Sequence, residues 1–189
     1  MTLGSWLQHK LLISGNIYVI NTFFYLMKLL IHTFMTFLFM SNLICAQDFK
    51  SEFYKAHIFI DYELYEMALP AFLELDRAYP GNSNVQAIIG YLYLHTPNQK
   101  EKSLKFLQSS QDKLSAYYKF RNHKEECAPI QSIWFLGKAY HANQQYEKAL
   151  EKFSEYKEVL RKSNKKDIAE INRDIQLSQN AKKSVSNSI

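Results

Sequence analysis

The sequence predicts an all-α protein: a short α-solenoid of about three helical hairpins with a capping helix at its C-terminal end. Three observations predict this class. Ala56 and Gly90 are separated by one period of a repeated helix pair, about 34 residues, and so are Phe59 and Tyr93. Small and apolar residues recur at separations of three and four, which places them on one helix face. An apolar N-terminal segment, with no Asp or Glu in residues 1–46, precedes the hairpins.

The third hairpin carries the pattern most completely. We expect Gly137 to let its first helix approach the second closely, Ala149 to do the same on the second helix, and Phe153 to fill the space between them. The other positions of the pattern are Ile133, Leu136, Tyr140, Tyr146 and Tyr156.

The first hairpin has the same small and aromatic positions, and Pro80 is expected to stop its second helix. Its matching residues are Ala56, Phe59, Ala68 and Phe72. Polar residues interrupt this copy, because Glu52 and Lys55 occupy places where the pattern is apolar.

The second hairpin is less regular, with Gly90 matched by Ser103 and Leu107 on the following helix. Gly90 and Gly137 are separated by more than one repeat period, so most of the excess length must fall around residues 117–127. We expect an extended second helix there, followed by a loop, with Pro129 opening the next helix.

These patterns resemble the tetratricopeptide repeat over about residues 49–157. The resemblance implies a right-handed α-solenoid with repeats at about 49–82, 83–116 and 130–163, inside a domain covering residues 47–183. Ile168, Ile171 and Ile175 recur in helical register, which predicts a capping helix at about residues 166–183. Residues 184–189 are polar and small, and we expect them to form a frayed tail.

Residues 27–46 resemble a secretory signal peptide. Lys28 supplies the positive charge, residues 29–40 the apolar stretch, and Ala46 the small residue before cleavage. We therefore expect Gln47 to begin the mature chain, Met27 to be the initiator, and residues 1–26 to be an over-extended start.

Two alternatives for this segment stay open. An uncleaved anchor over residues 17–44 would hold Lys28 and His32 within the bilayer, where a central Lys costs about 3 kcal/mol. A lipoprotein would carry its lipid on Cys45, although the bulky Ile44 precedes that cysteine.

Several classes of function are disfavoured. The sequence contains no phosphate-binding glycine loop, no HExxH pair and no GxSxG elbow, so we expect no enzyme activity and no cofactor. The cluster of His123, Glu125, Glu126 and Cys127 lacks the second ligand group of a structural zinc site, so we expect no metal. The net charge is +5, and it falls further when the leader is removed, which disfavours a nucleic-acid partner.

The repeat resemblance also implies which residues contact a partner. The first helix of each repeat would line a concave groove, and aromatic groups there suit an extended peptide or a partner helix. The alternative is that Phe53 and Trp134 simply pack against neighbouring helices. The expected groove residues are Phe53, Tyr54, His57, Asp61, Tyr91, His95, Trp134, Lys138 and His141.

The leader, the repeats, the turn that contains Pro97 and the Ala128–Pro129 entry to the third repeat are together similar to Bacteroidetes envelope proteins. In that family the repeats precede a β-propeller and an OmpA-like domain, and some members serve the type IX secretion apparatus. Neither downstream domain follows here, so we expect a truncated member or an isolated repeat module.

The resemblance implies a non-catalytic adaptor, located in the periplasm or at the periphery of the outer membrane, that binds an envelope protein in its groove. It would contact a membrane only through an uncleaved leader. The alternatives are a structural envelope spacer without an exchangeable client, and an inner-membrane-anchored accessory factor of an enzyme or transporter.

Overall fold

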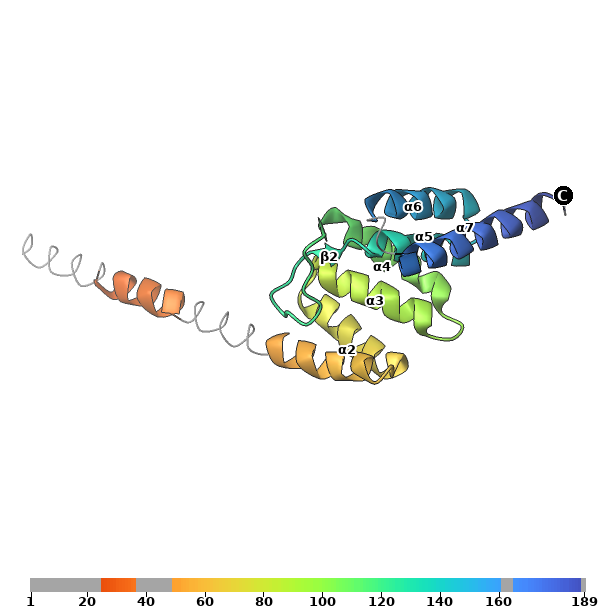
Figure 1. Ribbon diagram of the computed structural model, residues 1–189. Helices are drawn as coiled ribbons and strands as arrows, with labels where there is room; N and C mark the ends of the chain where they lie inside the picture. The colour runs from red at the N-terminus through yellow and green to blue at the C-terminus, as the bar shows by residue number, and fades with distance from the viewer. Residues whose placement is uncertain (1–24, 37–48, 161–164, 188–189) are drawn as a thin grey trace, which may run out of the picture. The chain divides into compact units, whose positions relative to one another are not determined.

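The computed structural model describes residues 25–36, 49–160 and 165–187, and these are mostly helical, as the sequence predicts (Figure 1). The chain divides into two compact units, Met1–Asp48 and Phe49–Ile189. In the first unit, residues 25–36 form a helix with exposed apolar side chains. No helix within the described ranges is long and apolar enough to cross a membrane. The expected cleavage site at Ala46 and Gln47, Cys45, and residues 1–24 of the expected over-extended start lie outside these ranges.

The second unit begins with a helix over residues 49–61. The elements that follow are α2 (Tyr65–Ala78), α3 (Ser83–His95), η1 (Lys100–Lys102), α4 (Ser103–Ser109), η2 (Ser110–Asp112), β1 (Leu114–Ser115), β2 (Ala128–Pro129), α5 (Ser132–Ala142), α6 (Tyr146–Val159) and α7 (Lys165–Ser186). From α2 onward, each α-helix packs against the next one, and α3 also packs against α5.

Local chemistry sets the boundary between α2 and α3. The helix α2 ends at Ala78, as predicted from Pro80, because proline disfavours helical backbone at the residue before it. Asn82 then caps α3, since its side-chain Oδ1 accepts a hydrogen bond from the Val85 backbone N–H at 3.0 Å. Such a cap satisfies one of the free N–H groups at a helix start.

Close contacts between paired helices form the core. A Cβ on Gly137 would lie only 2.5 Å from Phe153 Cε1, and a Cβ on Gly90 would collide with Leu107 in the same way. The predicted close approach at Gly137 is therefore confirmed. In the first hairpin, Ala56 and Phe72 are both fully buried in one apolar cluster.

The insertion between the second and third hairpins differs from our expectation. The expected extended helix is absent, because α4 ends at Ser109 and η2 at Asp112. Pro129 lies in the short strand β2 and not in a helix, since α5 begins at Ser132. We call residues 113–131 the connecting segment. Its two ends are joined by the parallel pair β1 and β2, in which Leu114 lies opposite Ala128.

The C-terminal helix α7 covers the third hairpin. Ile171 is fully buried in the same apolar cluster as Phe153 and Tyr156. Polar contacts at the edge tie α7 to α6, where Lys157 Nζ donates to Asn172 at 2.8 Å and Lys182 pairs with Glu147 at 3.1 Å. The apolar surface of the third hairpin is thereby shielded from water.

We predict that Gly137→Ala destabilises the protein by about 1–3 kcal/mol, because the added methyl group overpacks the contact with Phe153. In an exposed helix the same change would instead stabilise by about 1 kcal/mol. The free energy of unfolding should be measured by urea titration followed by circular dichroism.

Combining Gly137→Ala with Phe153→Leu is the control, because the smaller side chain leaves room for the methyl group. The two changes should then be non-additive, with part of the loss recovered. A Gly137→Ala protein as stable as the wild type would contradict the close approach.

Candidate functional site

Two of the expected groove residues on the helix over residues 49–61 lie in the core. Phe53 is fully buried and packs edge-on against Phe72, with ring centroids 5.9 Å apart. His57 is only 2% exposed and lies between the rings of Phe53, Phe72 and Phe120. Phe53 therefore packs against a neighbouring helix, the alternative given above, and His57 is not available to a partner while Phe120 covers it.

The connecting segment covers the same helix face and engages the other two expected residues. Tyr54 Oη lies 3.2 Å from His123 Nδ1, and Asp61 forms an ion pair with Arg121 at 2.7 Å. Both contacts join positions that are far apart in the sequence. The first-hairpin part of the predicted groove is thus occupied by the chain itself.

Asn84, at the start of α3, holds both arms of the connecting segment. Its side-chain Oδ1 accepts from the Tyr118 hydroxyl at 2.5 Å, and its Nδ2 donates to the Glu125 carbonyl at 3.2 Å. Its backbone N–H donates to the Glu126 carbonyl, also at 3.2 Å. Asn84 is fully buried. These hydrogen bonds replace the ones it would make to water, and without them burial of the amide would cost free energy.

The expected residues of the third hairpin contact the terminal helix α7. Trp134 Nε1 donates to Asp174 at 2.7 Å, and the Lys138 ammonium lies 3.6 Å from the same carboxylate and 4.1 Å from the Trp134 ring centre. His141 Nδ1 lies 2.7 Å from Ser178 Oγ. Trp134 is buried, whereas Lys138 and His141 keep partial exposure.

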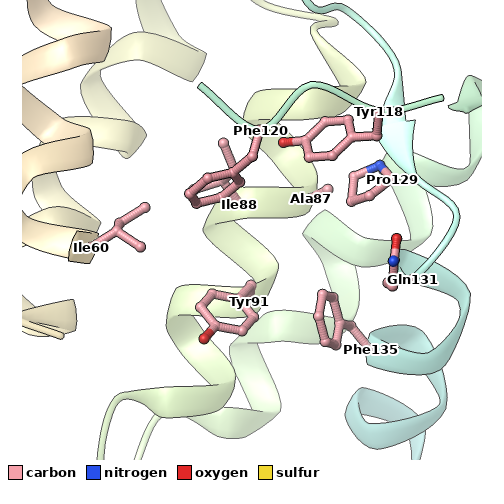
Figure 2. Close-up of a pocket in the computed structure, with 9 residues that line it drawn as sticks. All are labelled: Ile60, Ala87, Ile88, Tyr91, Tyr118, Phe120, Pro129, Gln131 and Phe135. Atoms are coloured by element: carbon pink, nitrogen blue, oxygen red, sulfur yellow. The ribbon is translucent and has the colours of Figure 1, made fainter. Parts of the chain in front are cut away.

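Between these two covered regions lies an open apolar pocket of about 330 Å³. Tyr91 of α3 and Phe135 of α5 lie side by side in its lining (Figure 2), and their ring centroids are 5.2 Å apart, so the two rings are in direct contact. The connecting segment forms a further wall. The lining residues are Ile60, Ala87, Ile88, Tyr91, Tyr118, Phe120, Pro129, Gln131 and Phe135.

A second pocket, of about 390 Å³, lies beside α7 and is more polar. It contains the remaining expected groove residue, His95, together with Lys138 and His141. The lining residues are Leu94, His95, Lys100, Lys138, His141, Ala142, Phe153, Asp174 and Leu177. Three expected residues therefore gather in one pocket, and Tyr91 lies in the other.

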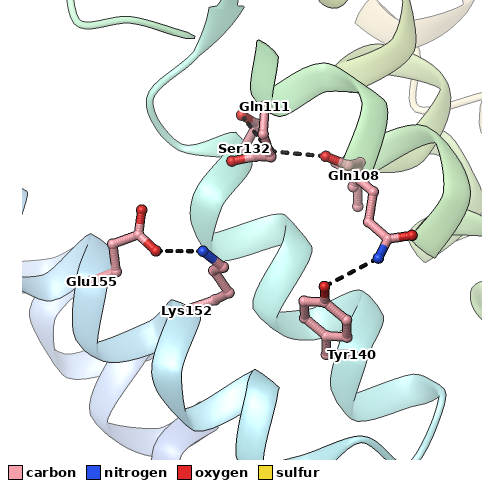
Figure 3. Close-up of polar contacts among 7 residues, drawn as sticks. Gln108, Gln111, Ser132, Tyr140, Lys152 and Glu155 are labelled. Carbon is pink, nitrogen blue, oxygen red and sulfur yellow. Dashed lines mark hydrogen bonds and ion pairs between the residues drawn. The ribbon is translucent and has the colours of Figure 1, made fainter. Parts of the chain in front are cut away.

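Polar contacts between the second and third hairpins fix the distance between the pocket walls. Gln108 Nε2 donates to the Tyr140 hydroxyl at 3.1 Å, and Gln111 Nε2 donates to Ser132 Oγ at 3.3 Å (Figure 3). Both bonds join the end of the second hairpin to α5. Because Phe135 also belongs to α5, these two hydrogen bonds help to hold it beside Tyr91.

No protein-family model matches this chain, and no curated protein matches it. Within residues 25–36, 49–160 and 165–187, no three His, Cys, Asp or Glu side chains are grouped so that they could hold a metal ion.

Burial controls the protonation of the histidine under the connecting segment. It lowers the pKa of His57 to about 4, with Asp61 raising the pKa and Arg121 lowering it to smaller extents. Neither ring nitrogen has a hydrogen-bond partner among the described residues. Protonation would therefore place an unsolvated charge among three aromatic rings.

We predict that His57 makes the protein less stable in acid. The unfolded chain binds the proton near pH 6.5 and the folded chain near pH 4, so this contribution is absent above pH 6.5 and grows as the pH falls to 4. It reaches about 3 kcal/mol at most. The measurement is the free energy of urea unfolding between pH 7 and pH 4.

The matched control is His57→Leu, which keeps an apolar side chain of similar size but cannot be protonated. Carboxylates titrate equally in both proteins, so the difference between the two pH profiles isolates His57. Parallel profiles would contradict the buried, neutral state of this residue.

Proposed function

We propose that this chain is a tetratricopeptide-type repeat protein that serves as a non-catalytic adaptor of the bacterial cell envelope. Its partner would be a protein segment that binds at the pocket beside α3 and α5. The observation that carries the proposal is the open apolar pocket lined by Tyr91, Phe135 and residues of the connecting segment, since an exposed aromatic concavity suits a partner's apolar side chain.

The repeat assignment is supported by equivalent contacts in successive hairpins. Gly90 meets Leu107 and Gly137 meets Phe153, so a glycine on the first helix faces a large side chain on the second in both hairpins. Such recurring contacts are typical of stacked helical repeats. The Bacteroidetes envelope family remains our proposal for its relatives, on the sequence patterns described above.

Photo-crosslinking tests the binding role. A photoreactive amino acid in place of Tyr91 should form protein adducts in the native envelope, whereas one in place of Glu151, which is exposed on α6, should not. Ala87→Leu would fill the pocket and should reduce the Tyr91 adduct about tenfold, equivalent to about 1.4 kcal/mol of binding energy. Equal labelling at both positions, or labelling insensitive to Ala87→Leu, would contradict a partner site in this pocket.

Export is tested by the N-terminal residue of the native protein. We expect mass spectrometry of protein from fractionated cells to find Gln47 first, because the leader has the composition of a cleaved signal. A start at Met1 or Met27 with the apolar stretch intact would instead favour the inner-membrane-anchored accessory factor. A lipid mass on Cys45 would favour the lipoprotein.

A further inference from the structure

The apolar pocket and the polar pocket are neighbours along the same two helices. On α3, Tyr91 lines the first and His95 the second, and their rings are in contact with centroids 4.2 Å apart. On α5, Phe135 lines the first and Lys138 the second. These separations of four and three positions correspond to about 6 Å and about 4.5 Å along a helix. The two pockets are therefore neighbours through residues of both helices, and we call them the apolar half and the polar half of the candidate site.

The apolar half suits a single large side chain. Pockets that bind ligands are lined mainly by apolar and aromatic groups, with few polar atoms. Here the polar atoms come from Tyr91, Tyr118 and Gln131 alone among the lining residues. The Tyr118 hydroxyl already donates to Asn84, so this half offers few hydrogen-bonding groups to a polar ligand.

The polar half favours an anion. The Lys100 ammonium forms no hydrogen bond or ion pair with any residue that the structure describes. The acidic group lining this half, Asp174, already accepts from Trp134 and lies beside Lys138. A partner's carboxylate could thus pair with Lys100 and also with Lys138, whose charge Asp174 neutralises only in part.

The protonation of His95 reflects the same positive potential. Burial is the largest cause lowering its pKa, opposed by the hydrogen bond between its Nδ1 and the Tyr91 carbonyl. The Lys138 and Lys100 ammonium groups lower the pKa further, and each has a larger effect than the opposing Glu63 carboxylate. His141 lies in the same pocket and shares a hydrogen bond with Ser178. The ammonium groups of Lys138 and Lys100 therefore affect the pKa of His95 more than the Glu63 carboxylate does.

We propose that the partner segment is an extended peptide that carries a large apolar side chain and a carboxylate two residues apart. Alternate side chains of an extended chain lie on one face about 6.5 to 7 Å apart, close to the helix rise of about 6 Å between Tyr91 and His95, which line the two pockets. The apolar side chain would enter the pocket beside the contacting rings of Tyr91 and Phe135, and the carboxylate would lie beside Lys100 and Lys138. This inference rests on the proposed function and specifies the chemistry of its ligand.

Capped peptides test the inference directly. The probes contain tryptophan and glutamate two residues apart, in either order, within a Gly-Ser background and with a fluorophore for anisotropy. At least one order should bind about tenfold more tightly than the same peptide with lysine for glutamate, and replacing tryptophan by alanine should abolish binding. Raising the salt concentration should weaken the glutamate peptide selectively, since exposed charges are screened.

A charge reversal locates the anionic contact. Lys100→Glu should remove the preference for glutamate over lysine, whereas Lys105→Glu, at an exposed lysine on α4, should leave it unchanged. Circular dichroism would establish that both variants are folded. Equal binding of the glutamate and lysine peptides, or an unchanged preference in Lys100→Glu, would overturn the inference.

The same experiments separate this inference from the proposed function. If no peptide binds while Tyr91 still crosslinks to a partner in an Ala87-dependent way, the ligand chemistry is wrong and the adaptor role stands. If the crosslink is also absent, the adaptor role fails.

Discussion

The close approach of paired helices is the constraint on which the candidate site depends. Gly90 lets α3 pack directly on Leu107, and Gly137 lets α5 pack directly on Phe153. The hydrogen bond between Gln108 and Tyr140 then joins α4 to α5. As a result, α3 and α5 lie side by side. In that arrangement Tyr91 and Phe135 are in contact and line the same pocket.

The connecting segment adds the remaining wall, and it does so through a buried amide. Asn84 bonds to Tyr118, Glu125 and Glu126, so the two arms of the segment are fixed on the start of α3. This bonding places Tyr118 at the pocket and Phe120 over His57. The insertion that interrupts the repeat spacing is thus the part that shapes the site.

Helical periodicity predicted the packing positions correctly, because those depend on residues three and four apart. Gly137 and Phe153 illustrate this success. For Phe53 the alternative of packing against a neighbouring helix was open from the sequence, and Phe53 does pack on Phe72. The cover of His57 could not be predicted, since it comes from Phe120 in the distant connecting segment. Nor could periodicity find Asn84, whose bonding partners also belong to that segment. On α5 the pattern pointed to Trp134, while the neighbouring Phe135 lines the apolar pocket.

The size of the open surface bears on whether an adaptor or a permanent structural spacer is the better proposal. The connecting segment covers His57 in the first hairpin and α7 contacts Trp134 in the third, so the expected groove is partly covered, while Tyr54 and Asp61 stay exposed and the two pockets are open. A short peptide segment seated in the two pockets would bury less than about 1,200 Å², in the range of transient complexes. A permanent spacer would need a larger apolar contact, since obligate interfaces are commonly well above this size and more hydrophobic. The covered groove therefore favours an exchangeable partner that binds through a short segment.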